Sequence, residues 1–497
     1  MEAYGGYDVV IVGGGTAGAV VAARLVERGA TVCLIEGGPS DVGDERVLRL
    51  RNWINLLESE LDYDYPITPQ PRGNSRIRHA RARVLGGCSS HNTMISFLPP
   101  PADFTDWVAA GADGWTYDSL VPLFQRLRTN IVPVAPRHRN ALTEAFVAAC
   151  AEALGVPVVE DFNAKPFVDG AGFVPVGYHP ETGVRSSSSV AYLHPILDHP
   201  NLTLLTDTWA YDIGIDGDRA VTIATSRGEI HGDQFVLCAG AIDTPRLLLL
   251  AGVGPARDLG TRTRLDLPGV GENLLDHPES IIMWEATRPL PPESAMDADA
   301  ALFVRRDTAQ DRPDLMFHIY QLPFTFNTEP LGYEVPGHGF GLTPNVPRPR
   351  SRGRLTLADD SPETKPLLDF RYFTDAEGHD ERTIVDGLRI AREVAAAAPL
   401  RDWIAREIAP GPSLTTDEEL SVYGRAAHHT VYHPAGTCRM GAPDDPLAVV
   451  DPKLRLRGLA NVRIADASVF PTLPSVNPMV TVLLVAERCA DLMTQPT

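Results

Sequence analysis

Three glycines and one acidic residue near the start of the chain are spaced for binding a nucleotide with two phosphates. In residues 13–18, Gly13 makes a tight turn, Gly15 lets the backbone approach a pyrophosphate, and Gly18 lets a helix pack closely on a strand. The N-terminus of the following helix would face the negative phosphates. Glu36 offers a carboxylate to ribose hydroxyl groups. The pattern predicts a bound dinucleotide, and at this point both FAD and NAD satisfy it.

The sequence around this turn supplies the elements that would position it. Residues 7–12 form a continuous apolar run typical of a buried parallel strand, and residues 19–27 have the pattern of a helix. Residues 31–36 predict a second strand, which ends in the acid. These segments have the order and lengths of a strand–helix–strand unit that binds a dinucleotide.

Nucleotide-binding elements recur in the middle and at the end of the chain. Residues 234–241 predict a buried strand entering a glycine turn, followed by a helix that starts at Pro245. Residues 462–466 and 479–493 predict a last strand and a last helix. Between these segments we expect a strand at residues 353–357 and a helix at residues 381–398. The arrangement favours one discontinuous nucleotide-binding domain with a substrate domain inserted into it.

Composition narrows the class of protein. The chain has 497 residues, which predicts two or three domains, and a net charge of −20. This charge argues against nucleic-acid binding and is compatible with a cationic substrate, although it also serves solubility alone. No apolar run approaches the ~20 residues that span a bilayer, and no signal peptide precedes the first strand. The six cysteines are scattered, which predicts a cytoplasmic protein without disulfides or a metal site.

Further segments resemble one family of flavoproteins. They are residues 83–92, 240–245, 433–441 and 466–468 and the pair Asn477-Pro478, which resemble segments of the glucose-methanol-choline (GMC) oxidoreductases. With the glycine turn, the resemblance covers essentially the whole chain. It implies FAD as the cofactor and an α/β fold (α+β overall), with a Rossmann-like FAD domain and a substrate domain built on an antiparallel sheet flanked by helices. The predicted division gives 1–155, 190–275 and 451–497 to the FAD domain and 156–189 and 276–450 to the substrate domain.

Within the family, the choline oxidase branch is the most similar. The segments that carry this resemblance are residues 53–59, 79–82, 185–190, 276–279, 372–380 and 430–434. Oxidation of an alcohol removes a hydroxyl proton and moves a hydride to the flavin, so a group near the hydroxyl must accept the proton. Histidine suits this role because its pKa lies near neutral pH. The resemblance implies that His433 accepts the proton, with Asn477 and His318 beside the substrate oxygen.

The resemblance also implies which residues hold FAD. They are Gly13, Gly15, Thr16, Ala17, Gly18, Glu36, Arg83, Gly86, Gly87, Ser90, His91, Asn92, Asp466, Ala467, Asn477 and Pro478. His91 matches a histidine that carries a covalent bond to the flavin in choline oxidases, whereas other members of the family bind FAD non-covalently. We therefore expect FAD to be attached through His91.

A cationic group on the substrate has its own predicted receptor. By resemblance, Glu279 receives an ammonium group, Trp53 and Tyr432 form aromatic walls, and Thr93 lies beside the flavin. The chain departs from the pattern at Ala298, where choline oxidases have a tryptophan. Two acids, Asp297 and Asp299, flank this alanine, and we expect them to add negative charge to a wider pocket.

These features predict an enzyme that oxidises a primary alcohol to the aldehyde, and on to the acid, with O₂ reduced to H₂O₂. The expected substrate is a cationic amino alcohol such as choline, and the expected assembly is a homodimer that binds neither nucleic acid nor membrane. The acids beside Ala298 favour an alternative, a dehydrogenase for a larger amine-bearing alcohol with another electron acceptor. A third alternative is a non-catalytic FAD-binding redox sensor.

Overall fold

Strand β1 (Tyr4–Val12) lies at the centre of a seven-stranded sheet in the computed structural model, which describes residues 4–164 and 167–494. It pairs in parallel with β2 (Val32–Ile35) on one side and with β12 (Gly228–Leu237) on the other. The remaining strands are β9 (Leu202–Leu205), β10 (Ala210–Asp216), β11 (Arg219–Thr225) and β25 (Val462–Ile464). The order β10-β11-β12-β1-β2-β9, with β25 paired to β12, confirms the discontinuous Rossmann-like sheet.

Helix α1 (Thr16–Glu27) starts inside the glycine turn, three residues before the predicted range, because Gly15 takes the N-cap position. Helix α6 (Gly240–Leu250) also starts earlier than predicted, so Pro245 lies inside it rather than at its start. A proline within a helix leaves one carbonyl without a backbone donor. Here the Thr437 hydroxyl donates to the Ala241 carbonyl at 2.7 Å and satisfies that group.

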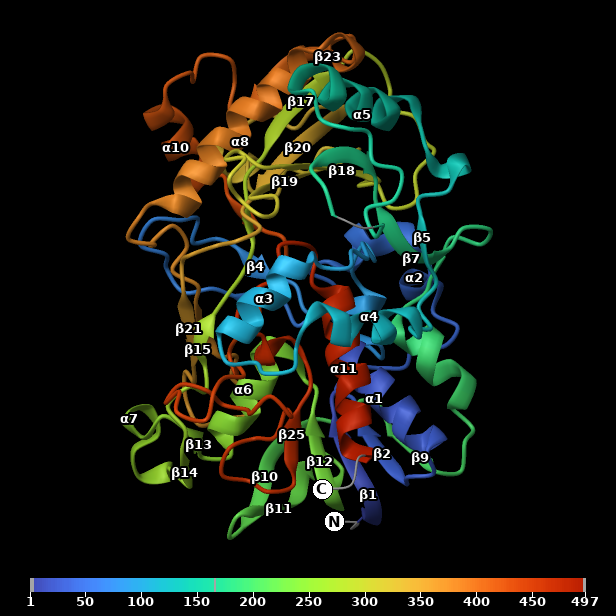
Figure 1. Cartoon of the computed structure of the whole chain (residues 1–497), viewed down its shortest axis with the longest axis vertical. Helices are drawn as coiled ribbons and strands as arrows, with labels where there is room; N and C mark the ends of the chain where they lie inside the picture. The colour runs from blue at the N-terminus through green and yellow to red at the C-terminus, as the bar shows by residue number, and fades with distance from the viewer. Residues whose placement is uncertain (1–3, 165–166, 495–497) are drawn as a thin grey trace.

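A second large sheet lies at the opposite end of the molecule (Figure 1) and is antiparallel throughout. Its main order is β23-β17-β20-β19-β18-β6, and β16 pairs with β20 and β24. Its strands are β6 (Gly170–Phe173), β16 (Pro278–Glu279), β17 (Ile282–Ala286), β18 (Ala300–Val304), β19 (Leu315–Tyr320), β20 (Gly339–Asn345), β23 (Ile404–Ala409) and β24 (His429–Thr430). The predicted antiparallel sheet of the substrate domain is therefore confirmed.

Helices cover this second sheet and bear on the predicted division into domains. Helix α8 (His379–Ala396), predicted at residues 381–398, packs against β20. Helix α5 (Ala141–Leu154) packs against β6 and β18, although the predicted boundary at residue 155 gave it to the FAD domain. Its apolar side needs a partner, and the strands of the second sheet supply one. The strand predicted at residues 353–357 is β21 (Gly353–Thr356), which belongs to a small separate sheet.

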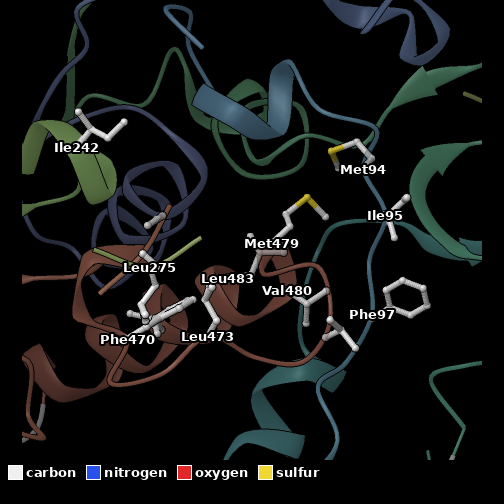
Figure 2. Close-up of a cluster of buried hydrophobic side chains, with 14 of the residues drawn as sticks. Met94, Ile95, Phe97, Ile242, Leu275, Phe470, Leu473, Met479, Val480 and Leu483 are labelled. Atoms are coloured by element: carbon white, nitrogen blue, oxygen red, sulfur yellow. The ribbon is translucent and has the colours of Figure 1, made fainter. Parts of the chain in front are cut away.

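The last helix brings the end of the chain to the segment that follows His91. Met479, Val480 and Leu483 of α11 (Met479–Thr494) belong to one buried cluster with Met94 and Phe97 (Figure 2). This packing holds the N-terminal end of α11, next to Asn477, beside residues 91–93. Among the residues described, no helix has the length and apolar character needed to cross a membrane.

Candidate active site

One cavity extends from the glycine turn at the end of β1 to strand β19 of the second sheet. Seventeen of the predicted site residues line it. They are Gly13, Gly15, Thr16, Ala17, Glu36, Trp53, Gly87, His91, Asn92, Thr93, His318, Tyr432, His433, Asp466, Ala467, Asn477 and Pro478. The fold thus joins the predicted cofactor residues and the predicted catalytic residues in a single space.

Two glycines of the turn, Gly13 and Gly18, have no room for a side chain. A Cβ atom on Gly18 would lie 1.9 Å from the carbonyl oxygen of Gly13, so only glycine lets α1 pack on the turn. Gly13 has a φ of +101°, and a Cβ there would lie 2.5 Å from the carbonyl oxygen of Cys238. Gly18 does not line the cavity, which agrees with a role in packing rather than in contact with a ligand.

Glu36 closes the nucleotide end of the cavity. Its carboxylate is buried and accepts hydrogen bonds from the backbone N–H groups of Gly14 at 2.9 Å and Gly38 at 2.7 Å. Burial raises the pKa of Glu36 to about 7. Tyr63 and Trp209 line the cavity beside it, with ring centroids 5.4 Å apart. No sequence pattern predicted these two aromatic residues, because they lie far apart in the chain.

Besides Gly18, three predicted cofactor residues do not line the cavity. The guanidinium of Arg83 lies 6.0 Å from the ring centroid of Trp209, so it contacts the cavity wall from behind. Gly86 donates its N–H to the Gly14 carbonyl at 2.8 Å. The Ser90 hydroxyl donates to the Leu85 carbonyl at 2.8 Å. Gly86 and Ser90 therefore hold the loop that places Gly87 against the glycine turn.

Asp466 joins the middle and the end of the chain at the cavity wall. Its buried carboxylate accepts hydrogen bonds from the N–H of Gly240 at 2.9 Å and from the Thr244 hydroxyl at 2.6 Å. It also accepts from the N–H of Ser468 at 2.8 Å. The start of α6 and the loop before α11 are thereby fixed to each other.

His433 has a defined tautomer, because its neighbour His277 leaves only one arrangement of protons. The Nδ1 atoms of the two rings lie 2.9 Å apart, and Nε2 of His277 lies 3.1 Å from the Pro347 carbonyl, which can only accept. Burial lowers the pKa of His277 to about 4 and, together with the charge of Arg81, holds that of His433 well below its usual range. Each neutral ring carries one proton, so His277 donates from Nε2 and His433 donates from Nδ1. The Nε2 atom of His433 is left with a free lone pair.

Asp276 fixes the backbone of the same histidine. Its carboxylate accepts hydrogen bonds from the N–H of His433 at 2.9 Å and from the Tyr372 hydroxyl at 2.6 Å, and its side chain is fully buried. Burial raises the pKa of Asp276 to about 6. The adjacent residues Asp276 and His277 thus hold the backbone and the ring of His433. The sequence did not single out either one for this role, because the contact spans more than 150 residues.

His318 and Asn477 complete the polar wall next to His433. His318 points from β19, and burial lowers its pKa to about 4, with the Asn477 side chain opposing this shift. Both ring nitrogens of His318 and Oδ1 of Asn477 are buried and make no well-formed hydrogen bond within the described part of the chain. Buried polar atoms normally have partners, so this wall is suited to a ligand that supplies a hydroxyl group.

The predicted receptor for an ammonium group lies partly behind the wall. Trp53 and Tyr432 line the cavity, and Trp53 is fixed by a 2.7 Å hydrogen bond from its indole N–H to the Met296 carbonyl. Glu279 does not line the cavity. It is buried on β16, and its Oε2 has no hydrogen-bond partner among the described residues. Burial raises the pKa of Glu279 to about 8.

The expectation that two acids add charge to the pocket is wrong. Asp297 is held outside the cavity by a salt bridge with Arg51, with a shortest N–O distance of 2.7 Å. Asp299 is fully buried and accepts hydrogen bonds from Ser294 at 2.5 Å and Gln321 at 2.8 Å. Both carboxylates are therefore occupied by the protein itself. Ala298 between them does line the cavity, as expected.

Comparisons with known proteins agree with this geometry over nearly the whole chain. Two models of the GMC oxidoreductases match residues 7–279 and 349–486. The chain is 45% identical to choline oxidase from Arthrobacter globiformis, over 98% of this chain and 94% of that protein. It is 31% identical to an oxygen-dependent choline dehydrogenase from Brucella suis, over 97% and 95% of the two chains.

Solved structures agree as well. The crystal structure of pyridoxine 4-oxidase from Mesorbium loti superposes with a TM-score of 0.90 at 30% identity, covering 98% of this chain and 99% of that one. The chain therefore belongs to the GMC oxidoreductase family, and it is an FAD-dependent enzyme that oxidises alcohols.

Proposed function

We propose that the enzyme oxidises a primary alcohol on a cationic amino alcohol such as choline to the aldehyde and on to the acid, with O₂ as the electron acceptor. The observation that carries this proposal is the group formed by His433, His318 and Asn477 in the same cavity as the glycine turn. The names of the relatives from Arthrobacter globiformis and Brucella suis support the choice of substrate and acceptor.

Different residues of the cavity have different roles in the proposed reaction. Bound FAD supplies the acceptor for the hydride that leaves the alcohol carbon. His433 accepts the hydroxyl proton at Nε2, the ring atom that its contact with His277 leaves unprotonated. His318 and Asn477 hold the substrate oxygen through the polar atoms that lack protein partners.

The cavity fits FAD at its nucleotide end. Gly13 and Gly15 of the glycine turn line this end, Glu36 faces it as well, and α1 starts here, so that its first N–H groups are close to the cavity. His91 lines the cavity and is neutral because burial lowers its pKa to about 3. Its Nε2 donates to the Leu56 carbonyl at 3.0 Å, so Nδ1 keeps a lone pair. A neutral imidazole of this kind can attack an electrophilic carbon, which supports a covalent attachment of FAD to His91.

We expect the flavin to stay with the protein after acid precipitation, and to be released from the His91→Asn variant. The expectation follows because asparagine has no nucleophilic nitrogen at this position. The measurement is the absorbance of flavin in the pellet and in the supernatant, with the flavin-containing peptide identified by mass spectrometry. Yellow supernatants from both proteins would rule out the covalent bond and leave non-covalent binding of FAD.

Turnover with choline in air tests the proposed substrate and acceptor. We expect two O₂ to be consumed and two H₂O₂ to be formed per choline, because the aldehyde is oxidised as well. Rapid reduction of an artificial acceptor with no peroxide would replace the oxidase by a dehydrogenase. The alternative substrate, a larger amine-bearing alcohol, has lost its support because Asp297 and Asp299 are occupied by Arg51, Ser294 and Gln321.

A homodimer in the cytoplasm stays a prediction of the sequence. All six cysteines are free and five of them are buried, which agrees with a reducing compartment. Size-exclusion chromatography with light scattering would measure the assembly directly.

A further inference from the structure

The cavity wall at Ala298 lies next to the end of strand β19, a neighbour that the sequence did not predict. Ala298 precedes β18, and the backbone N–H of Gln321 donates to the Asp297 carbonyl at 2.8 Å, which continues the pairing of β18 with β19. The end of β19 therefore lies directly beside residue 298. The last residue of β19 is Tyr320.

The direction of the Tyr320 side chain follows from the alternation of a strand. Residues two apart in a strand point to the same face. His318 and Tyr320 are two apart, and both line the cavity, as does Ala298. The small side chain of Ala298 thus leaves space on the wall where the ring of Tyr320 enters from the neighbouring strand.

The ring of Tyr320 is held by other aromatic residues. Its centroid lies 6.3 Å from that of Trp53, at an interplanar angle of 33°. On another side it stacks on Phe324, with centroids 4.7 Å apart and planes at 9°. Phe324 in turn contacts His429, with centroids 5.7 Å apart. An aromatic ring packed in this way presents a fixed face with little loss of entropy on binding.

A carboxyl group lies next to this aromatic wall. Glu279 on β16 pairs with His429, whose ring centroid lies 5.2 Å from that of Tyr432 and 5.7 Å from that of Phe324. Besides burial, the Glu279 carboxylate raises the pKa of both Tyr320 and Tyr432. Three rings, Trp53, Tyr320 and Tyr432, therefore line a space backed by a carboxyl group. A cation over aromatic faces is attracted by the rings, and a buried carboxylate adds to this attraction.

We propose that Tyr320 is a specificity-determining residue, which supplies the aromatic wall missing at Ala298 and makes the site select a methylated, quaternary ammonium group over a primary one. The proposal rests on the proposed function for the site and deepens it. A primary ammonium needs hydrogen-bond acceptors for its N–H groups, whereas a quaternary one does not. The carboxylates of Asp297 and Asp299 cannot serve as these acceptors, because Arg51, Ser294 and Gln321 occupy them.

Binding of tetramethylammonium chloride to the FAD-loaded enzyme tests this proposal without any turnover. For Tyr320→Ala we expect binding to be about 2- to 30-fold weaker, the range of a lost cation–π contact. Tyr320→Phe keeps the ring and is expected to retain binding. The double variant Tyr320→Ala with Ala298→Trp is expected to recover it, because the tryptophan supplies a ring to the same wall. Calorimetry gives the affinities, and flavin content with thermal melting checks that each variant folds.

Two results would overturn the proposal. One is equal binding of tetramethylammonium by the original enzyme and by a folded Tyr320→Ala variant. The other is tighter binding of ammonium or methylammonium than of tetramethylammonium by the original enzyme. Failure of the proposed oxidation is distinguishable, because Tyr320-dependent binding of tetramethylammonium in an enzyme that no alcohol reduces supports the role of Tyr320 and contradicts only the reaction.

Discussion

Replacing His433 with alanine is expected to slow reduction of the bound flavin by the alcohol substrate about 10²- to 10⁴-fold, the usual contribution of general acid–base catalysis. The variant should still bind FAD, because the glycine turn, Glu36 and Asp466 are independent of the His433 ring. The reason for the loss is that alanine removes the only unprotonated Nε2 that the His277–His433 contact prepares for the substrate proton. Anaerobic stopped-flow absorbance of the flavin measures the rate.

A second buried histidine provides a matched control. His428 is fully buried, and its Nδ1 forms a hydrogen bond with the Arg425 carbonyl at 2.8 Å. It does not line the cavity. His428→Ala is expected to lower the melting temperature and to leave the rate of flavin reduction close to that of the original enzyme. A His433→Ala variant with full flavin content and an unchanged reduction rate would contradict the role given to His433.

Replacing Glu279 with glutamine is expected to lower kcat/KM for choline about 10- to 100-fold at a pH where the glutamate is charged. This is about 1.4–2.8 kcal/mol, within the range for two unit charges about 4 Å apart at a protein site. Glutamine keeps the shape and removes the charge. The neutral isostere 3,3-dimethylbutan-1-ol serves as the control, because its quaternary carbon has the shape of trimethylammonium without the charge. Its kcat/KM should change little, and an equal loss for both substrates would mean that Glu279 acts through packing.

The pH dependence of the same residue gives an independent check. Burial raises the pKa of Glu279 to about 8, so in the free enzyme the carboxyl group is neutral below that pH and negative above it. Choline is a cation at every pH. We therefore expect kcat/KM for choline to rise with pH through about 8, beyond any change seen with the neutral isostere. Glu279→Gln should abolish this difference, and a profile for choline that falls over this range would contradict the assignment.

Local patterns in the sequence were enough to predict the turn and the acidic residue that line the nucleotide end of the cavity. The glycine turn and Glu36 lie within a short stretch, and their spacing is dictated by clashes such as the 1.9 Å approach of a Gly18 Cβ to Gly13. The predicted start of α6 at Pro245 was wrong, because a proline usually lies in the first turn of a helix. Only a hydroxyl from Thr437, almost 200 residues away, lets Pro245 lie inside.

The substrate end depends on contacts that no local pattern contains. From the sequence, Asp297 is expected to lie in the pocket. In the structure it is held by Arg51, which is 246 residues away in the chain. The role of His277 depends on the contact between its ring and that of His433, which no local sequence pattern shows. No sequence pattern pointed to Tyr320, because its proposed role depends on the neighbouring strand, where Ala298 leaves space. Resemblance to relatives predicted the loss of one aromatic wall, but the structure was needed to find its replacement.

Anaerobic mixing of the purified, FAD-loaded enzyme with choline tests the central claim most directly. The account predicts that choline bleaches the flavin absorbance in a single fast phase, and that 2-aminoethanol at the same concentration does so far more slowly. Admission of air should then restore the oxidised spectrum and yield H₂O₂. A flavin that choline leaves fully oxidised, in an enzyme that another alcohol reduces, would contradict the proposed substrate.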